Sequence, residues 1–114
     1  MSDDTVNLHP DAAEEELYRC EIIANNSVED DIVEVLETAC PGILYTILPS
    51  VHGRGKNDRK LSSTTWPETN FILFTYVTKD KLDGVRMAVR AVKERFRGEG
   101  IKLFIVKGFF PEQV

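Results

Sequence analysis

The chain has 114 residues and a formal net charge of −5, which is enough length for one domain with its own hydrophobic core. Its two cysteines, Cys20 and Cys40, have the spacing of neither a disulfide framework nor a zinc ligand set. No apolar run is long enough to cross a bilayer, and the first residues lack the basic and apolar regions of a signal peptide. We therefore expect a cytoplasmic protein.

The negative charge is concentrated in residues 1–16, which carry six acidic side chains and no Lys or Arg. Low apolar content and like charge predict a flexible tail there. A single domain is expected over residues 17–108, with a short extension over 109–114. Because the rest of the chain is nearly neutral, we expect no broad basic surface for nucleic acid.

The first half of the domain predicts a strand, a helix and a second strand. Residues 17–24 are apolar with strand character, and Asn25-Asn26-Ser27 offers capping groups for the helix that follows. Apolar side chains recur at helical spacing over 28–39. Residues 43–51 predict the second strand, in which Pro49 indicates an edge position or a bulge.

The second half repeats this pattern in the order strand, helix, strand. Residues 70–77 have the clearest strand pattern in the chain. Thr78 can cap a helix whose apolar stripe runs from Leu82 to Phe96. Gly98-Glu99-Gly100 then ends the helix and precedes a strand over 101–106. The order predicts a ferredoxin-like βαββαβ fold of class α+β, with two helices on one face of a four-stranded antiparallel sheet.

The third and last strands carry apolar side chains on both faces. Phe71 and Leu73 lie on one side of the third strand, whereas Phe74 and Tyr76 lie on the other. Phe104 of the last strand adds to the second set. Two helices cover only one face, and soluble monomers avoid large exposed apolar patches. We therefore expect a homo-oligomer, with ligand sites between subunits.

The loop over residues 53–67 carries the strongest functional signal. In Gly53-Arg54-Gly55-Lys56 the glycines let the backbone approach a ligand closely, and the cations beside them favour an anion. A solvated loop without a ligand is the alternative, and Trp66 could equally anchor the loop on the core. The residues predicted to contact a partner protein are Arg59, Lys60 and Trp66.

Two glycine segments resemble those of the PII-like signal-transduction superfamily. The run from Val51 to Lys56 resembles the V-x-G-x-G-R segment that opens the family's T-loop, and Gly98-Glu99-Gly100 with the strand after it resembles its B-loop. The likeness covers about residues 17–108. It implies a homotrimer that binds an adenine nucleotide (ATP, ADP or AMP) between a T-loop base and the B-loop of a neighbour. The matching ligand-binding positions are Gly53, Arg54, Gly55, Lys56, Gly98, Gly100 and Lys102.

The chain also departs from the strict nitrogen-regulatory pattern. The 53–67 loop has no tyrosine for uridylylation, and the arginines that help hold nucleotide phosphates near the C-terminus are missing. The resemblance thus implies a divergent regulator whose effector is a nucleotide, another small anion, a metal ion or nothing. Such a regulator would signal to an unidentified protein, for example a membrane transporter or an enzyme.

The sequence supports an enzymatic or a metal-binding function less than it supports a ligand-binding regulator. No G-x-S-x-G motif and no local Cys-His or Ser-His pairing occurs, so we expect a binding protein rather than an enzyme. One alternative is a trimer similar to the CutA divalent-cation tolerance proteins. It would use three copies of the candidate ligand His52, because a metal site needs three or four ligands. The other alternative is an interaction module with a vestigial ligand site.

Overall fold

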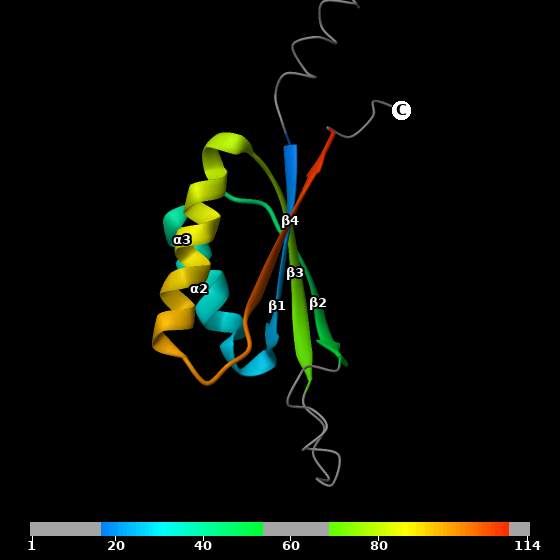
Figure 1. Ribbon diagram of the computed structural model, residues 1–114, viewed down its shortest axis with the longest axis vertical. Coiled ribbons are helices and arrows are strands. Elements are labelled where there is room, and N and C mark those ends of the chain that lie inside the picture. The colour runs from blue at the N-terminus through cyan, green and yellow to red at the C-terminus, as the bar shows by residue number, and fades with distance from the viewer. Residues whose placement is uncertain (1–16, 54–68, 110–114) are drawn as a thin grey trace, which may run out of the picture.

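The computed structural model describes residues 17–53 and 69–109. In this part of the chain two α-helices cover one face of a four-stranded antiparallel sheet, and the other face is open (Figure 1). The predicted ferredoxin-like βαββαβ fold is therefore confirmed. The predicted tail over 1–16 and most of the extension over 109–114 lie outside the described residues.

The elements follow the predicted order along the chain. They are β1 (Leu17–Asn25), the 3-10 helix η1 (Asn26–Val28), α2 (Glu29–Ala39), β2 (Thr46–Val51), β3 (Asn70–Thr78), α3 (Lys79–Arg95) and β4 (Lys102–Gly108). The strand order in the sheet is β2-β3-β1-β4. Consequently β2 and β4 are the two edge strands, and β1 and β3 lie in the centre.

The start of the first helix is stabilised by side chains in the way the sequence predicts. The Oδ1 atom of Asn25 accepts a hydrogen bond from the backbone N of Ser27 at 2.8 Å. Three acidic residues in the first turn of α2 then complement the positive end of the helix dipole. The helix ends at Ala39, and Gly42 reverses the chain with a φ of +79°, a conformation that favours glycine.

The prediction that the second strand begins at residue 43 is wrong, because β2 starts at Thr46. The backbone N of Ile43 donates to the carbonyl of Cys40 at 3.0 Å, so residue 43 belongs to the turn after α2. The carbonyl of Leu44 accepts a hydrogen bond from Thr75 Oγ1 at 2.7 Å. Thr75 is buried, and this contact satisfies its hydroxyl.

Thr78 precedes α3 as predicted, but its side chain does not bond to the helix backbone. Its hydroxyl donates instead to the carboxylate of Asp80. That hydrogen bond lowers the pKa of Asp80 because it stabilises the ionised carboxylate. The ionised carboxylate of Asp80 lies in the first turn of α3, where its negative charge complements the helix dipole.

The core lies between the helices and the inner face of the sheet. Alternate strand residues such as Ile22, Phe71 and Leu73 are buried there, against a stripe of α3 that includes Val85 and Val92. Cys20 belongs to the same cluster, and burial raises the pKa of its thiol to about 11. The thiol is therefore protonated near neutral pH and is a core side chain rather than a nucleophile.

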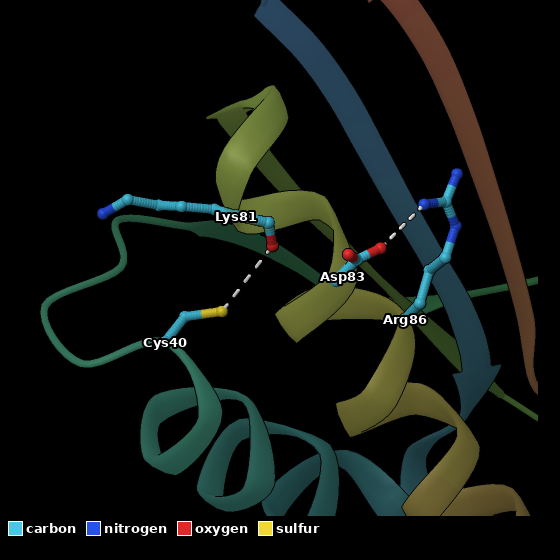
Figure 2. Close-up of polar contacts among 4 residues, drawn as sticks. All are labelled: Cys40, Lys81, Asp83 and Arg86. Atoms are coloured by element: carbon cyan, nitrogen blue, oxygen red, sulfur yellow. Dashed lines mark hydrogen bonds and ion pairs between the residues drawn. The ribbon is translucent and has the colours of Figure 1, made fainter.

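The end of α2 packs closely against the beginning of α3 at Gly84. A Cβ atom at position 84 would lie 2.7 Å from Cys40 Sγ and 3.4 Å from the carbonyl oxygen of Ala39. Figure 2 shows the Cys40 side chain directed at the first turn of α3, where Sγ lies 4.0 Å from the carbonyl of Lys81. Glycine at this position thus lets the two helices approach each other.

We expect Gly84→Ala to lower the free energy of unfolding by about 1–3 kcal/mol, because the added methyl group collides with the buried sulfur. Intrinsic helix propensity alone would favour alanine by about 1 kcal/mol. In a Cys40→Ala background, the same substitution should be neutral or stabilising. Urea unfolding of the four proteins, followed by circular dichroism, measures this coupling. An equal cost in both backgrounds would show that Cys40 is not the obstacle.

Candidate functional site

The two segments singled out by the sequence lie at one end of the sheet. Val51 at the end of β2 pairs with Asn70, and Asn70 pairs with Asn25 at the end of β1. Lys102 at the start of β4 pairs with Ile23, two residues in from that end. The foot of the loop after β2 and the turn before β4 therefore lie at the same end of the molecule (Figure 1).

These segments nevertheless lie on opposite edges of the sheet. Three inter-strand steps separate β2 from β4 in the order β2-β3-β1-β4, which corresponds to about 14 Å. A single phosphate or carboxylate cannot touch both edges within one subunit. Within one subunit, the described foot of the loop and the turn before β4 are therefore too far apart to share one small anion.

The loop begins at an irregular end of β2. The pairing register of β2 with β3 shifts between Leu48 and Val51, and Ser50 has a φ of +55°. The bulge predicted from Pro49 is thereby confirmed, on an edge strand. Left-handed backbone costs a non-glycine residue roughly 1–2 kcal/mol, so the end of β2 holds Ser50 in an unfavourable conformation.

At the foot of the loop, His52 and Gly53 are both exposed. A Cβ atom on Gly53 would lie 3.6 Å from Asn70 Nδ2, an ordinary contact distance. Gly53 therefore lies beside the first residue of β3. The other predicted loop residues lie outside the described residues; they are Arg54, Gly55, Lys56, Arg59, Lys60 and Trp66.

The turn before β4 contains two glycines that the subunit itself does not require. Gly98 and Gly100 are exposed, neither has a positive φ, and an added Cβ atom on either would contact nothing within 4 Å. The turn is closed by a hydrogen bond from the backbone N of Glu99 to the carbonyl of Phe96 at 3.0 Å. Its backbone is accordingly open to close approach by another molecule.

Lys102 is exposed and lies on the open face of the sheet. Its partner Ile23 belongs to the outward set of β1, whereas Leu103 belongs to the set that faces the helices. Among the described residues, no carboxylate forms an ion pair with Lys102. Its positive charge is therefore available to a molecule that covers this face.

Among the described residues, the open face is apolar around the ion pair of Arg19 and Glu21. Its exposed apolar side chains, with their exposed fractions, are Leu48 (45%), Tyr76 (60%), Phe104 (48%) and Val106 (43%). In the middle of β1, Arg19 Nε lies 2.7 Å from Glu21 Oε2. Sequence reasoning missed this pair, although residues two apart in a strand lie on the same face. The face predicted to be uncovered is uncovered in the single chain.

The described part of the chain shows neither a metal-binding cluster nor a membrane-spanning helix. There, no group of three or more His, Cys, Asp or Glu side chains could hold a metal ion. None of the helices at 29–39 and 79–95 is long and apolar enough to cross a membrane. A metal site at His52 would therefore need ligands beyond those that one described subunit brings together.

No family model matches the chain, and no curated protein matches it. Solved structures do match. CPII, a nitrogen regulatory PII-like protein from Thiomonas intermedia K12 bound to ADP, AMP and bicarbonate, is 14% identical, with a TM-score of 0.64 over 87% of this chain and 97% of that chain. A protein from Thermus thermophilus, classed as a PII-like signalling protein, is 22% identical, with a TM-score of 0.56 over 84% and 90%.

The same arrangement also occurs in a de novo designed protein, Foldit4. It is 11% identical to this chain, with a TM-score of 0.53 over 81% of this chain and 97% of that one. A shared fold does not imply a shared function, so likeness at this level of identity shows the fold alone. The resemblance predicted from the two glycine segments is confirmed at that level: this chain has the fold of PII-like proteins.

Proposed function

We propose that this protein is a small homotrimeric regulator rather than an enzyme. It binds an adenine nucleotide (ATP, ADP or AMP) or another small anion at clefts between subunits, and it signals to a partner protein through the 53–67 loop. The observation that carries the proposal is the position of the foot of the 53–67 loop and of the turn before β4, at one end of the sheet but on opposite edges. CPII, which shares the fold, was solved with ADP, AMP and bicarbonate.

The trimer is supported by the open face of the sheet. Burial of its apolar side chains against a second copy removes them from water and so lowers the free energy of the assembly. In a closed ring of identical subunits each interface is heterologous, so one subunit presents a different surface from that of its neighbour. Such a ring can place the β2 edge of one subunit beside the β4 edge of the next, which brings the two glycine segments together.

The proposed ligand contacts divide between backbone and charged groups. Gly53, Arg54, Gly55 and Lys56 come from one subunit, and Gly98, Gly100 and Lys102 come from its neighbour. Successive backbone N–H groups in glycine-rich turns donate to phosphate oxygens, and Lys and Arg neutralise their charge. Lys102 supports this assignment, because its exposed charge lies on the face that a neighbour would cover.

Signalling is proposed to depend on the residues that continue the loop. Ligand contacts at Gly53–Lys56 would hold the base of the loop in one conformation. The partner protein would then meet Arg59, Lys60 and Trp66 in an arrangement that depends on the ligand. A ligand shifts such an equilibrium only by its difference in affinity for the two arrangements.

The test is a thermal-shift and calorimetric titration of the wild-type protein with ADP, AMP and ATP, each with and without Mg²⁺. A ligand that binds only the folded state at 100 times its Kd should add about 2.7 kcal/mol to the free energy of unfolding. GDP and pyrophosphate are the matched controls for the adenine base and for the phosphate charge. No shift with any of these anions at millimolar concentration would refute the proposal. A shift with Cu²⁺ or Ni²⁺ that is lost in His52→Ala would favour the CutA-like alternative.

A further inference from the structure

The side chain of Asn26 links the turn after β1 to the segment that leads into β3. Its Nδ2 atom donates a hydrogen bond to Thr69 Oγ1 at 2.9 Å. Its backbone N donates to the carbonyl of Thr69 at 3.1 Å. Two hydrogen bonds thus join a pair of residues that are 43 apart in sequence. Thr69 is the first described residue after the 54–68 segment.

The turn after β1 does not need the Asn26 side chain for its own structure. Asn25 already supplies the capping acceptor, which the backbone N of Ser27 occupies at 2.8 Å. Val28 anchors the same turn in the core, where it is buried. The hydrogen bond that the Asn26 side chain makes is therefore directed at Thr69, outside its own turn.

Asn70, the first residue of β3, lies beside the last residues of both neighbouring strands. It pairs with Val51 of β2 and with Asn25 of β1, and Thr69 immediately precedes it. A Cβ atom on Gly53 would lie 3.6 Å from Asn70 Nδ2, so the first glycine of the predicted ligand segment is next to it. A displacement of Thr69 would consequently move Asn70 and change the position of Gly53 beside it.

The Oδ1 atom of Asn26 is buried, and none of the described residues donates a hydrogen bond to it. An unpaired buried acceptor is unfavourable. The amide group is thus held in place with only one of its two polar ends satisfied. That end is the one that meets Thr69.

We propose that Asn26 is a positioning residue for the ligand site. It holds Thr69, and through Thr69 and Asn70 it holds Gly53, at the foot of the loop, in the arrangement that receives the effector. The effector part rests on the proposed function, whereas the hold on Gly53 is a property of the ligand-free protein. The experiment separates the two.

The ligand-free arm measures amide hydrogen exchange by NMR. Thr69→Val keeps the shape of the side chain but removes the hydroxyl, so the amide of residue 26 should exchange about five- to tenfold faster. The amide signals of Val51 and Gly53 should also move, in this variant and in Asn26→Ala. The controls are Thr69→Ser, which keeps the hydroxyl, and Ser27→Ala, an exposed position in the same turn; both should behave as wild type. Unchanged exchange at residue 26 and unmoved signals at Gly53 in Thr69→Val would overturn the proposal.

The second arm measures ADP affinity by calorimetry. Asn26→Ala and Thr69→Val should each bind ADP about five- to tenfold more weakly. Their double variant should be no weaker than the weaker single one, because both changes remove one contact. Unchanged ADP affinity in both variants would overturn the link to the effector. If the wild-type protein binds no ADP, the proposed function fails. The hydrogen-exchange experiment on the ligand-free protein then decides by itself whether Asn26 holds Gly53 in place.

Discussion

Phe104→Glu is expected to break the proposed trimer into monomers. Phe104 lies on the open face with about half of its surface exposed in the single chain, and it pairs across the strands with Glu21. In the proposed oligomer a carboxylate there would be taken out of water, and it would lie directly opposite a like charge. Such a charge costs several kcal/mol, and a trimer would contain it three times. Light scattering after gel filtration should show a mass near 12.9 kDa in place of three times that value.

Two further variants test whether the face itself is responsible. Tyr76→Glu places the carboxylate opposite Arg19, so it should also break the trimer but without a like-charge contact inside the subunit. Met87→Glu makes an equally polar change at an exposed site of α3, where Met87 is 62% exposed, and should leave the trimer intact. Trimeric Phe104→Glu and Tyr76→Glu proteins, or a monomeric wild type, would contradict the proposed interface.

Arg54→Glu and Lys56→Glu should each reduce ADP affinity by about a hundredfold or more. Each change removes a charge-assisted hydrogen bond to phosphate and adds a repulsive charge, which together amount to about 3 kcal/mol or more. Titration calorimetry measures the affinity, and gel filtration checks that each variant keeps the oligomeric state of the wild type.

Lys79→Glu is the matched control for this charge reversal. Lys79 is an exposed residue at the start of α3, at the end of the sheet opposite to the proposed site, so its variant should bind ADP as the wild type does. The dependence on salt adds a second check. Wild-type affinity should fall as the NaCl concentration rises, and the two loop variants should show a weaker dependence. Wild-type affinity in either loop variant would remove that residue from the site.

The regular part of the fold could be predicted because it depends on local patterns. Alternation placed Phe71 and Leu73 on one face of β3 and Phe74 and Tyr76 on the other, and the structure confirms both sets. A strand has a side-chain period of two, so a run of five or six residues is enough to assign its faces. The same patterning indicated the uncovered face, since two helices cannot cover both sides of one sheet.

The prediction was wrong or incomplete where a distant residue decides the outcome. The carbonyl of Leu44 is occupied by Thr75, 31 positions away, and this contact helps to shorten β2. The two hydrogen bonds between Asn26 and Thr69 join polar residues that no motif or periodicity in the sequence connects. Thr78 looked like a helix cap but bonds to a neighbouring side chain instead.

By itself, therefore, the sequence determined the order of strands and helices, the two faces of the sheet and the two glycine segments that resemble those of PII-like proteins. These features follow from side-chain periodicity and from short motifs, which act over a few neighbouring residues. Only the tertiary structure placed the foot of the 53–67 loop and the turn before β4 on opposite edges at one end of the sheet and joined Asn26 to Thr69. Both results depend on how strands far apart in the chain pair and close together, and that pairing is set by burial of the whole core rather than by any local segment.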